Sequence, residues 1–141
     1  MARADVALLA TLAVAAACAA PGYSPFPLDL EHRLPADAFD RCRDVLLRRF
    51  VTLTRSDRQG FLIQTAWAPS QDPPGERRAS VFLDPAVSDS LAVVVELRRL
   101  RVPLIGMPSW TEPRGDAAAE RALAEVLRAA LAEPADVDVT P

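Results

Sequence analysis

Histidine is the side chain that catalytic sites most often use near neutral pH, and this chain of 141 residues has only one, His32. A Ser/His/Asp mechanism would need His32 as its general base. His32 lies beside Glu31 in a proline-rich stretch, and the sequence contains no G-x-S-x-G motif that would present a serine nucleophile. We therefore expect His32 to be a solvated histidine without a catalytic role.

Metal ligands and phosphate-binding loops are just as sparse in the sequence. Neither C-x-x-C nor H-E-x-x-H occurs, and the 5 glycines stand apart from one another. Paired carboxylates such as Asp84 and Asp89 are present, as in any acidic chain, but no pattern sets them in a pocket. The sequence thus predicts a protein that is not an enzyme, with no catalytic residues, no metal site and no cofactor.

Arginine supplies all 16 basic residues of the chain. Arg98, Arg99 and Arg101 cluster at the end of an apolar segment. The guanidinium group is a planar fork that pairs with phosphates and carboxylates, so these three residues are candidates for contact with a lipid headgroup or an acidic partner protein. The alternative is that they form a solvated face. A net charge of -3 argues against nucleic acid as a partner.

The N-terminal segment has the features of an export signal. Arg3 precedes an apolar run from Val6 to Ala17, which is shorter than the roughly 20 helical residues that span a hydrocarbon core. A basic start, an apolar middle and small residues at the end are typical of secretory signal peptides. The final residues, Val14-Ala15-Ala16-Ala17-Cys18, resemble the lipobox of bacterial lipoproteins, with Ala15 where leucine is the commoner residue.

The lipobox resemblance implies that residues 1–17 are removed and that Cys18 is acylated, for example with palmitate. Cys18 would then anchor the mature chain in the cell envelope, since two or more acyl chains hold a protein stably on a membrane. Ala19 follows the cysteine, and in the sorting rules of that family a residue other than aspartate implies the outer membrane, facing the periplasm. If the signal peptide is cut after Ala19 instead, the protein is secreted or periplasmic; a retained N-terminal helix is the third alternative.

A proline-rich linker and an amphipathic helix follow. Residues 18–36 are expected to hold the domain away from the membrane, with one short edge strand between Leu28 and Leu34. Asp37 is the expected N-cap of a helix over Ala38–Arg49. Its apolar stripe comprises Phe39, Cys42, Leu46 and Phe50, with Ala38 and Val45 beside it. Because an acylated Cys18 leaves no disulfide partner, we expect Cys42 to be a small core residue.

Four strands are predicted next. They are Val51–Ser56, Phe61–Trp67, Ser80–Asp84 and Leu91–Leu100, the first two forming a hairpin. Pro69–Arg78 is expected to be a polar loop. Val102–Gly115 is expected to be irregular, with Trp110 covering one edge of the core.

A second amphipathic helix completes the predicted domain. It spans Ala117–Leu131 with Asp116 as its N-cap, and an acidic, disordered tail covers residues 132–141. The order α-β-β-β-β-α predicts that residues 37–131 form an α+β two-layer sandwich, with an antiparallel sheet of about four strands and two helices on one face.

The segment Asp37–Trp67 resembles the helix, strand, turn, strand unit of small envelope-lipoprotein domains. The nearest of these is component C of the outer-membrane β-barrel assembly machinery. The resemblance rests on element spacing and a Ser-Asp-Arg-x-Gly turn, covers about a fifth of the chain, and carries over no functional residue. It implies an accessory or scaffolding role at the envelope rather than catalysis.

Three functional hypotheses follow from the sequence. The leading one is a lipid-anchored envelope module that contacts another envelope protein or a lipid headgroup, which a flat, exposed apolar patch would favour. The second is a small-ligand-binding periplasmic domain, which an apolar cavity near Trp67 or Trp110 would favour. The third is a small secreted hydrolase that uses carboxylates, which a water-filled pocket with converging carboxylates would favour.

Overall fold

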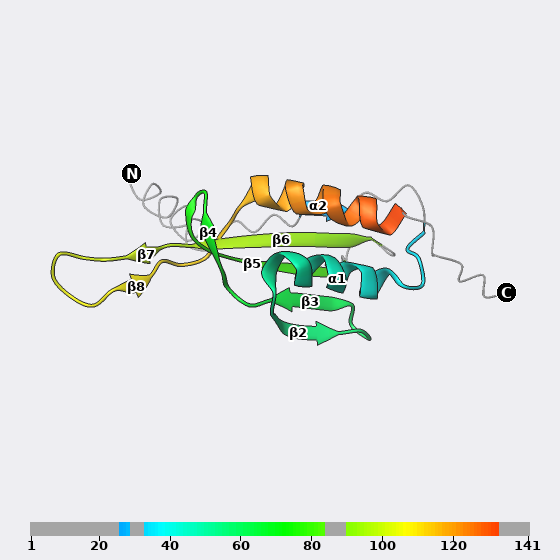
Figure 1. Cartoon of the computed structure of the whole chain (residues 1–141), viewed down its shortest axis with the longest axis horizontal. Coiled ribbons are helices and arrows are strands. Elements are labelled where there is room, and N and C mark those ends of the chain that lie inside the picture. The colour runs from blue at the N-terminus through cyan, green and yellow to red at the C-terminus, as the bar shows by residue number, and fades with distance from the viewer. Residues whose placement is uncertain (1–25, 29–32, 84–89, 133–141) are drawn as a thin grey trace, which may run out of the picture.

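The computed structural model describes residues 26–28, 33–83 and 90–132 (Figure 1). These residues form two helices, α1 (Ala38–Phe50) and α2 (Ala117–Ala132), and nine strands. The strands are β1 (Phe26–Leu28), β2 (Leu53–Asp57), β3 (Leu62–Thr65), β4 (Ala68–Gln71), β5 (Pro74–Leu83), β6 (Leu91–Arg98), β7 (Leu100–Arg101), β8 (Ser109–Trp110) and β9 (Arg114–Gly115). The protein is therefore of the α+β class, as the sequence predicts.

The main sheet is antiparallel throughout and has the order β1-β6-β5-β3-β2. β4 pairs with β5, and β9 pairs with β6, which makes seven strands in the part of the chain that the structure describes. The predicted number of about four is too low. The additional strands have two to four residues, which is too short for an alternating pattern to stand out in the sequence.

The predicted polar loop Pro69–Arg78 is wrong. β4 and the first half of β5 pair across a tight turn in this segment, from Ala68 opposite Arg77 to Gln71 opposite Pro74. Charged residues are acceptable inside this ladder because they have ionic partners: Arg77 reaches Asp116 at 2.7 Å, and Arg78 reaches Glu96.

Both helices pack on one face of the sheet. α1 lies against β2, β3 and β5, α2 lies against β1 and β6, and the two helices contact each other. Cys42 is fully buried in the core between these layers, as its position on the apolar stripe predicts. The core comprises Leu28, Ala38, Phe39, Cys42, Val45, Leu46, Ile63, Ala79, Val81, Leu91, Val93, Val95, Leu123, Ala124, Leu127 and Leu131.

The two helix N-termini differ in how they are capped. The carboxylate of Asp116 accepts a hydrogen bond from the Ala119 amide at 3.1 Å, so its predicted role as N-cap of α2 is confirmed. Asp37 also stands before its helix, but its carboxylate accepts from Arg41 Nε at 2.7 Å instead and makes no capping bond.

The segment expected to be irregular contains a two-stranded hairpin. β7 and β8 pair through Leu100 opposite Trp110 and Arg101 opposite Ser109, and the hairpin projects beyond the end of the main sheet (Figure 1). Trp110 belongs to this hairpin and is 42% exposed, so the expectation that it covers the core is wrong.

Candidate interaction surface

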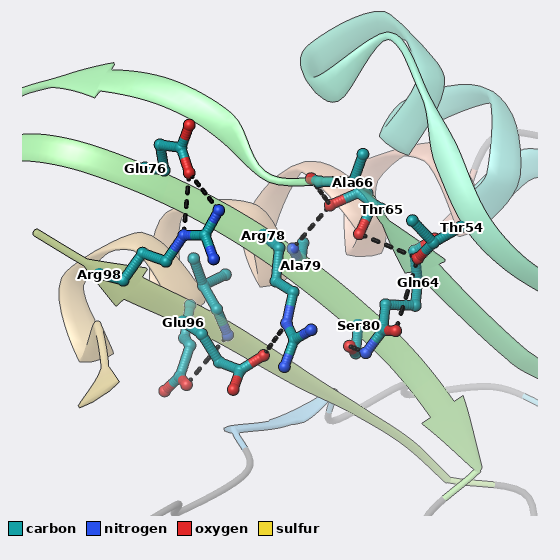
Figure 2. A network of polar contacts seen from close by, with 12 residues as sticks. Thr54, Gln64, Thr65, Ala66, Glu76, Arg78, Ala79, Ser80, Glu96 and Arg98 are labelled. Atoms are coloured by element: carbon teal, nitrogen blue, oxygen red, sulfur yellow. Dashed lines mark hydrogen bonds and ion pairs between the residues drawn. The ribbon is translucent and has the colours of Figure 1, made fainter. Parts of the chain in front are cut away.

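The face of the sheet that carries no helix bears two cross-strand ion pairs near the end of β6. Glu76 lies directly opposite Arg98, and Arg78 lies directly opposite Glu96 (Figure 2). Arg98 donates to Glu76 Oε2 from Nε at 2.8 Å and from Nη2 at 2.6 Å, while Arg78 Nε donates to Glu96. These pairs place four charged groups side by side where the sheet meets the β7–β8 hairpin.

Two tryptophan rings hold the Arg98 side chain. Its guanidinium carbon lies 4.3 Å from the centre of the Trp67 ring and 4.4 Å from that of Trp110. The guanidinium of Arg78 stacks on Trp67 as well, at 4.7 Å. Stacking of this kind is attractive because the ring faces carry negative potential. Arg98 therefore fastens the base of the hairpin to the sheet.

The hairpin is a ribbon with two unlike sides. Leu100 and Trp110 lie opposite each other on one side, and Arg101 and Ser109 on the other. At its base, the Thr111 amide donates to the carbonyl of Arg99 at 2.8 Å, and the Arg99 amide donates to Thr111 Oγ1 at 2.9 Å. The ribbon is thus hydrogen-bonded up to the turn.

The turn of the hairpin is uncharged and apolar. Residues 102–108, which we call the apolar tip, read Val-Pro-Leu-Ile-Gly-Met-Pro. Leu104 is fully exposed, Ile105 is 94% exposed and Met107 is 85% exposed. Large apolar side chains gathered on one projection are uncommon in a monomeric protein unless they contact something else.

A hollow lies at the base of the hairpin, between β7–β8 and the N-terminus of α2. It has a volume of about 1220 Å³, and Trp110 forms part of its wall. Three exposed arginines line it, Arg99, Arg101 and Arg114, and none of them has an ion pair among residues 26–28, 33–83 and 90–132. We call this feature the arginine hollow.

The three arginines predicted to contact a headgroup or a partner have different surroundings. Arg98 is held by Glu76, Trp67 and Trp110, whereas Arg99 and Arg101 lie in the arginine hollow. Arg114 joins them there, although nothing in its sequence context groups it with the others.

Several other residues considered from the sequence lie outside the described part of the chain. They are Cys18 with the rest of the signal segment, His32, Asp84, Asp89 and the tail from residue 133. Cys42 is described, and burial raises the pKa of its thiol to about 12. Its thiol is therefore protonated at neutral pH.

Two carboxyl groups away from the hairpin have shifted pKa values. Hydrogen bonds from Arg58, at 2.5 and 2.9 Å, lower the pKa of Asp40 at the surface. Burial raises the pKa of Glu120, an effect that the hydrogen bond from the Val95 amide partly offsets and the charge of Asp116 reinforces.

Among residues 33–83 and 90–132, neither helix is long and apolar enough to cross a bilayer. The same residues bring together no group of three or more His, Cys, Asp or Glu side chains that suits a metal ion. Comparison of the chain with protein-family models, curated proteins and solved structures gives no match.

The apolar tip is the feature that sequence reasoning missed. Its signal is a run of seven uncharged residues bounded by Arg101 and Ser109, with a proline near each end. Proline and glycine indicated an irregular segment, but leucine, isoleucine and methionine are the residues expected in a core.

Proposed function

We propose that this protein is a lipid-anchored module of the cell envelope, with Cys18 as the acylated residue and an interaction role rather than a catalytic one. The anchor holds the chain on a membrane, in the outer membrane and facing the periplasm by the sorting rule that Ala19 satisfies. The contact surface is the β7–β8 hairpin with the arginine hollow at its base.

The exposure of the apolar tip is the observation that carries the interaction role. The tip contributes nothing to the core. Its large side chains, Leu104, Ile105 and Met107, are exposed at the end of a hydrogen-bonded ribbon. Burying apolar surface of this kind contributes roughly 25 cal/mol per Å². A complex in which a partner covers the tip is therefore stabilised in proportion to the apolar area that is buried. An exposed apolar patch is the feature expected of an interaction module.

Three carboxylates near the hairpin are engaged in ion pairs, which does not favour a hydrolase, although Glu112, which also lines the hollow, has no ion pair among the described residues. Glu76 is held by Arg98, Glu96 by Arg78, and Asp116 by Arg77 at 2.7 Å. A hydrolase would need a carboxylate free to contact its substrate, whereas these three are held by arginines.

The anchor is tested by the mass of the mature N-terminus after expression of the full chain in a Gram-negative host. We expect a chain that begins at Cys18 and carries covalently bound acyl groups, and incorporation of labelled palmitate. Cys18→Ser abolishes the label and releases the protein from the membrane fraction. The matched control is Cys42→Ala, which removes the other cysteine and keeps the label. An unmodified N-terminus at Ala20 would refute the anchor.

A second candidate function, the binding of a small anionic ligand, is supported by the arginine hollow itself. Three arginines without ionic partners in the described residues, next to an aromatic wall, suit a ligand with a phosphate or carboxylate group. A rise in the unfolding midpoint with small organic phosphates, in the absence of lipid, and its loss in Arg99→Gln/Arg101→Gln, would favour this function.

A further inference from the structure

The β7–β8 hairpin has an order of side chains that matches the layers of a bilayer surface. From the turn toward the base come uncharged apolar residues, then Arg101 opposite Ser109, then Leu100 opposite Trp110, and then Arg99. Membrane-bound proteins place apolar residues deepest and tryptophan at the level of the headgroups, where basic residues also meet anionic lipid. We propose that the apolar tip inserts into the interfacial region of a lipid bilayer while Arg101 binds lipid phosphates and Arg99 and Arg114, farther back, add attraction to the anionic surface. This deepens the proposed function by naming the partner of the hairpin.

The dimensions of the hairpin suit this arrangement. A strand advances about 3.3 Å per residue, so Arg101 lies roughly 10 Å behind Leu104 and Ile105. Interfacial segments bury their apolar residues about 5–10 Å below the headgroups. When the tip reaches that depth, Arg101 lies level with the phosphates, and Arg99 and Arg114 lie farther back along the hairpin.

The backbone of the tip makes shallow insertion acceptable. Pro103 and Pro108 carry no N–H group, so they leave fewer donors to desolvate. Behind them the ribbon pairs through Leu100 with Trp110 and Arg101 with Ser109. The N–H groups that remain at the turn can donate to headgroup oxygens and water. At the bilayer centre they would have no such acceptors.

Charge favours an anionic lipid surface over an acidic protein groove. The segment from Arg99 to Arg114 holds three arginines and one acidic residue, Glu112, in a chain whose net charge is -3. Each basic residue near an anionic membrane strengthens binding about fivefold. An acidic protein groove would satisfy the arginines but would leave the uncharged tip without a matching partner.

The test places an environment-sensitive fluorophore at the tip of the full chain. In a Cys18→Ser background, Ile105→Cys supplies one accessible thiol, because Cys42 is fully buried. An N-terminal histidine tag and a nickel-chelating lipid hold the chain on phosphatidylcholine vesicles that contain phosphatidylglycerol. Insertion of the tip is then measured on a chain that cannot be acylated, so its failure is distinct from failure of the lipid anchor.

We expect the probe at position 105 to shift to shorter wavelength, to gain several-fold in intensity and to be quenched by nitroxide-labelled lipids. The matched control is Glu125→Cys, on an exposed position of α2, whose probe stays accessible to iodide in the water. If the tethered protein leaves the probe at 105 as accessible to iodide as the one at 125, the proposal is overturned. Shielding that requires added membrane proteins would assign the tip to a protein and overturn it as well.

The arginines are tested in the same format. Arg99→Gln/Arg101→Gln lowers the ratio of inserted to exposed probe about tenfold, and it weakens the dependence on phosphatidylglycerol. Arg48→Gln/Arg49→Gln changes the net charge equally at the exposed end of α1 and leaves the ratio within about twofold of that of the parent chain. Equal losses in both double variants would mean that overall charge alone attracts the protein, which contradicts the assigned role of the hollow.

Discussion

Glu120 of α2 completes the hydrogen bonding of Val95 in β6. The Val95 amide donates to Glu120 Oε1 at 3.1 Å, and the Val95 carbonyl accepts from the Asp116 amide at 2.8 Å. Val95 stands between the residues of β6 that pair with β1 and those that pair with β9. The first turn of α2 therefore fills a gap in the edge of the sheet and fixes the start of the helix beside the arginine hollow.

The pH dependence of stability should report this contact. Because the pKa of Glu120 is raised in the folded protein, the folded state binds its proton more tightly than the unfolded state does. Its contribution to stability is complete below the unfolded pKa, about 4.5, and is lost as the pH rises through the folded pKa. Glu120→Gln removes this dependence, so the variant gains stability relative to the parent between pH 4 and pH 7 in urea unfolding.

Glu120→Ala distinguishes the hydrogen bond from the charge. This variant leaves the buried Val95 amide without its acceptor, which costs about 1–3 kcal/mol at every pH. If Glu120→Gln and Glu120→Ala unfold at the same urea concentration, the contact with Val95 makes no contribution.

Gly75 is the residue that lets β5 approach the end of β6. Its φ is +148°, and a Cβ atom there would lie 2.3 Å from the carbonyl oxygen of Arg98. We expect Gly75→Ala to cost about 3 kcal/mol or more, because the ladder beside Arg98 has to open. Gly106→Ala is the matched control, since Gly106 also has a positive φ, +117°, but its Cβ would meet nothing closer than Pro103 at 3.6 Å. It should cost about 1 kcal/mol; equal losses would contradict the close approach.

Val51 follows α1 in a conformation that valine rarely adopts. Its φ is 67°, and the Thr52 amide donates to the carbonyl of Phe50 at 2.7 Å across it, which is a strained three-residue turn. Because the side chain is exposed, Val51→Gly should stabilise the protein by about 1 kcal/mol in thermal or urea unfolding. Val51→Ala keeps a Cβ atom and should gain less. A glycine variant less stable than the parent would show that the turn is not strained.

The thiol of Cys42 should be inert in the folded protein. Burial raises its pKa to about 12, so at pH 8 the reactive thiolate is scarce and also inaccessible. In a Cys18→Ser background we expect alkylation to slow at least about a hundredfold relative to the denatured chain. Stoichiometric labelling within minutes, without denaturant, would contradict the burial of this residue.

Regular apolar spacing made the helices predictable, and α1 and α2 end within one residue of their predicted limits. Pairing among charged strand residues was not predictable, because Arg77 and Arg78 read as loop residues until Asp116 and Glu96 are seen beside them. The alternation of apolar and polar residues predicted the strands of the core. It did not predict the strands that are held by ion pairs and turns.

The candidate interaction surface was less accessible to sequence reasoning than the fold. Leucine, isoleucine and methionine at 104, 105 and 107 have the composition of a core segment, and only the path of the chain shows that they are exposed. The arginine cluster was visible in the sequence. Its division was not, since Arg98 points toward Glu76 and two tryptophans whereas Arg99 and Arg101 line the hollow.

Trp110 should hold the base of the hairpin without supporting the core. Its ring lies 4.4 Å from the Arg98 guanidinium, a contact worth about 0.5–2 kcal/mol, and it is not part of the core cluster. We therefore expect Trp110→Ala to lower the hydrogen-exchange protection of the amides of Arg99 and Thr111 about tenfold, with little change in the unfolding midpoint. Trp110→Phe keeps an aromatic face over Arg98 and should retain most of the protection. If protection falls equally in β5 and β6, Trp110 supports the whole sheet; if it falls nowhere, the stack on Arg98 does not hold the hairpin.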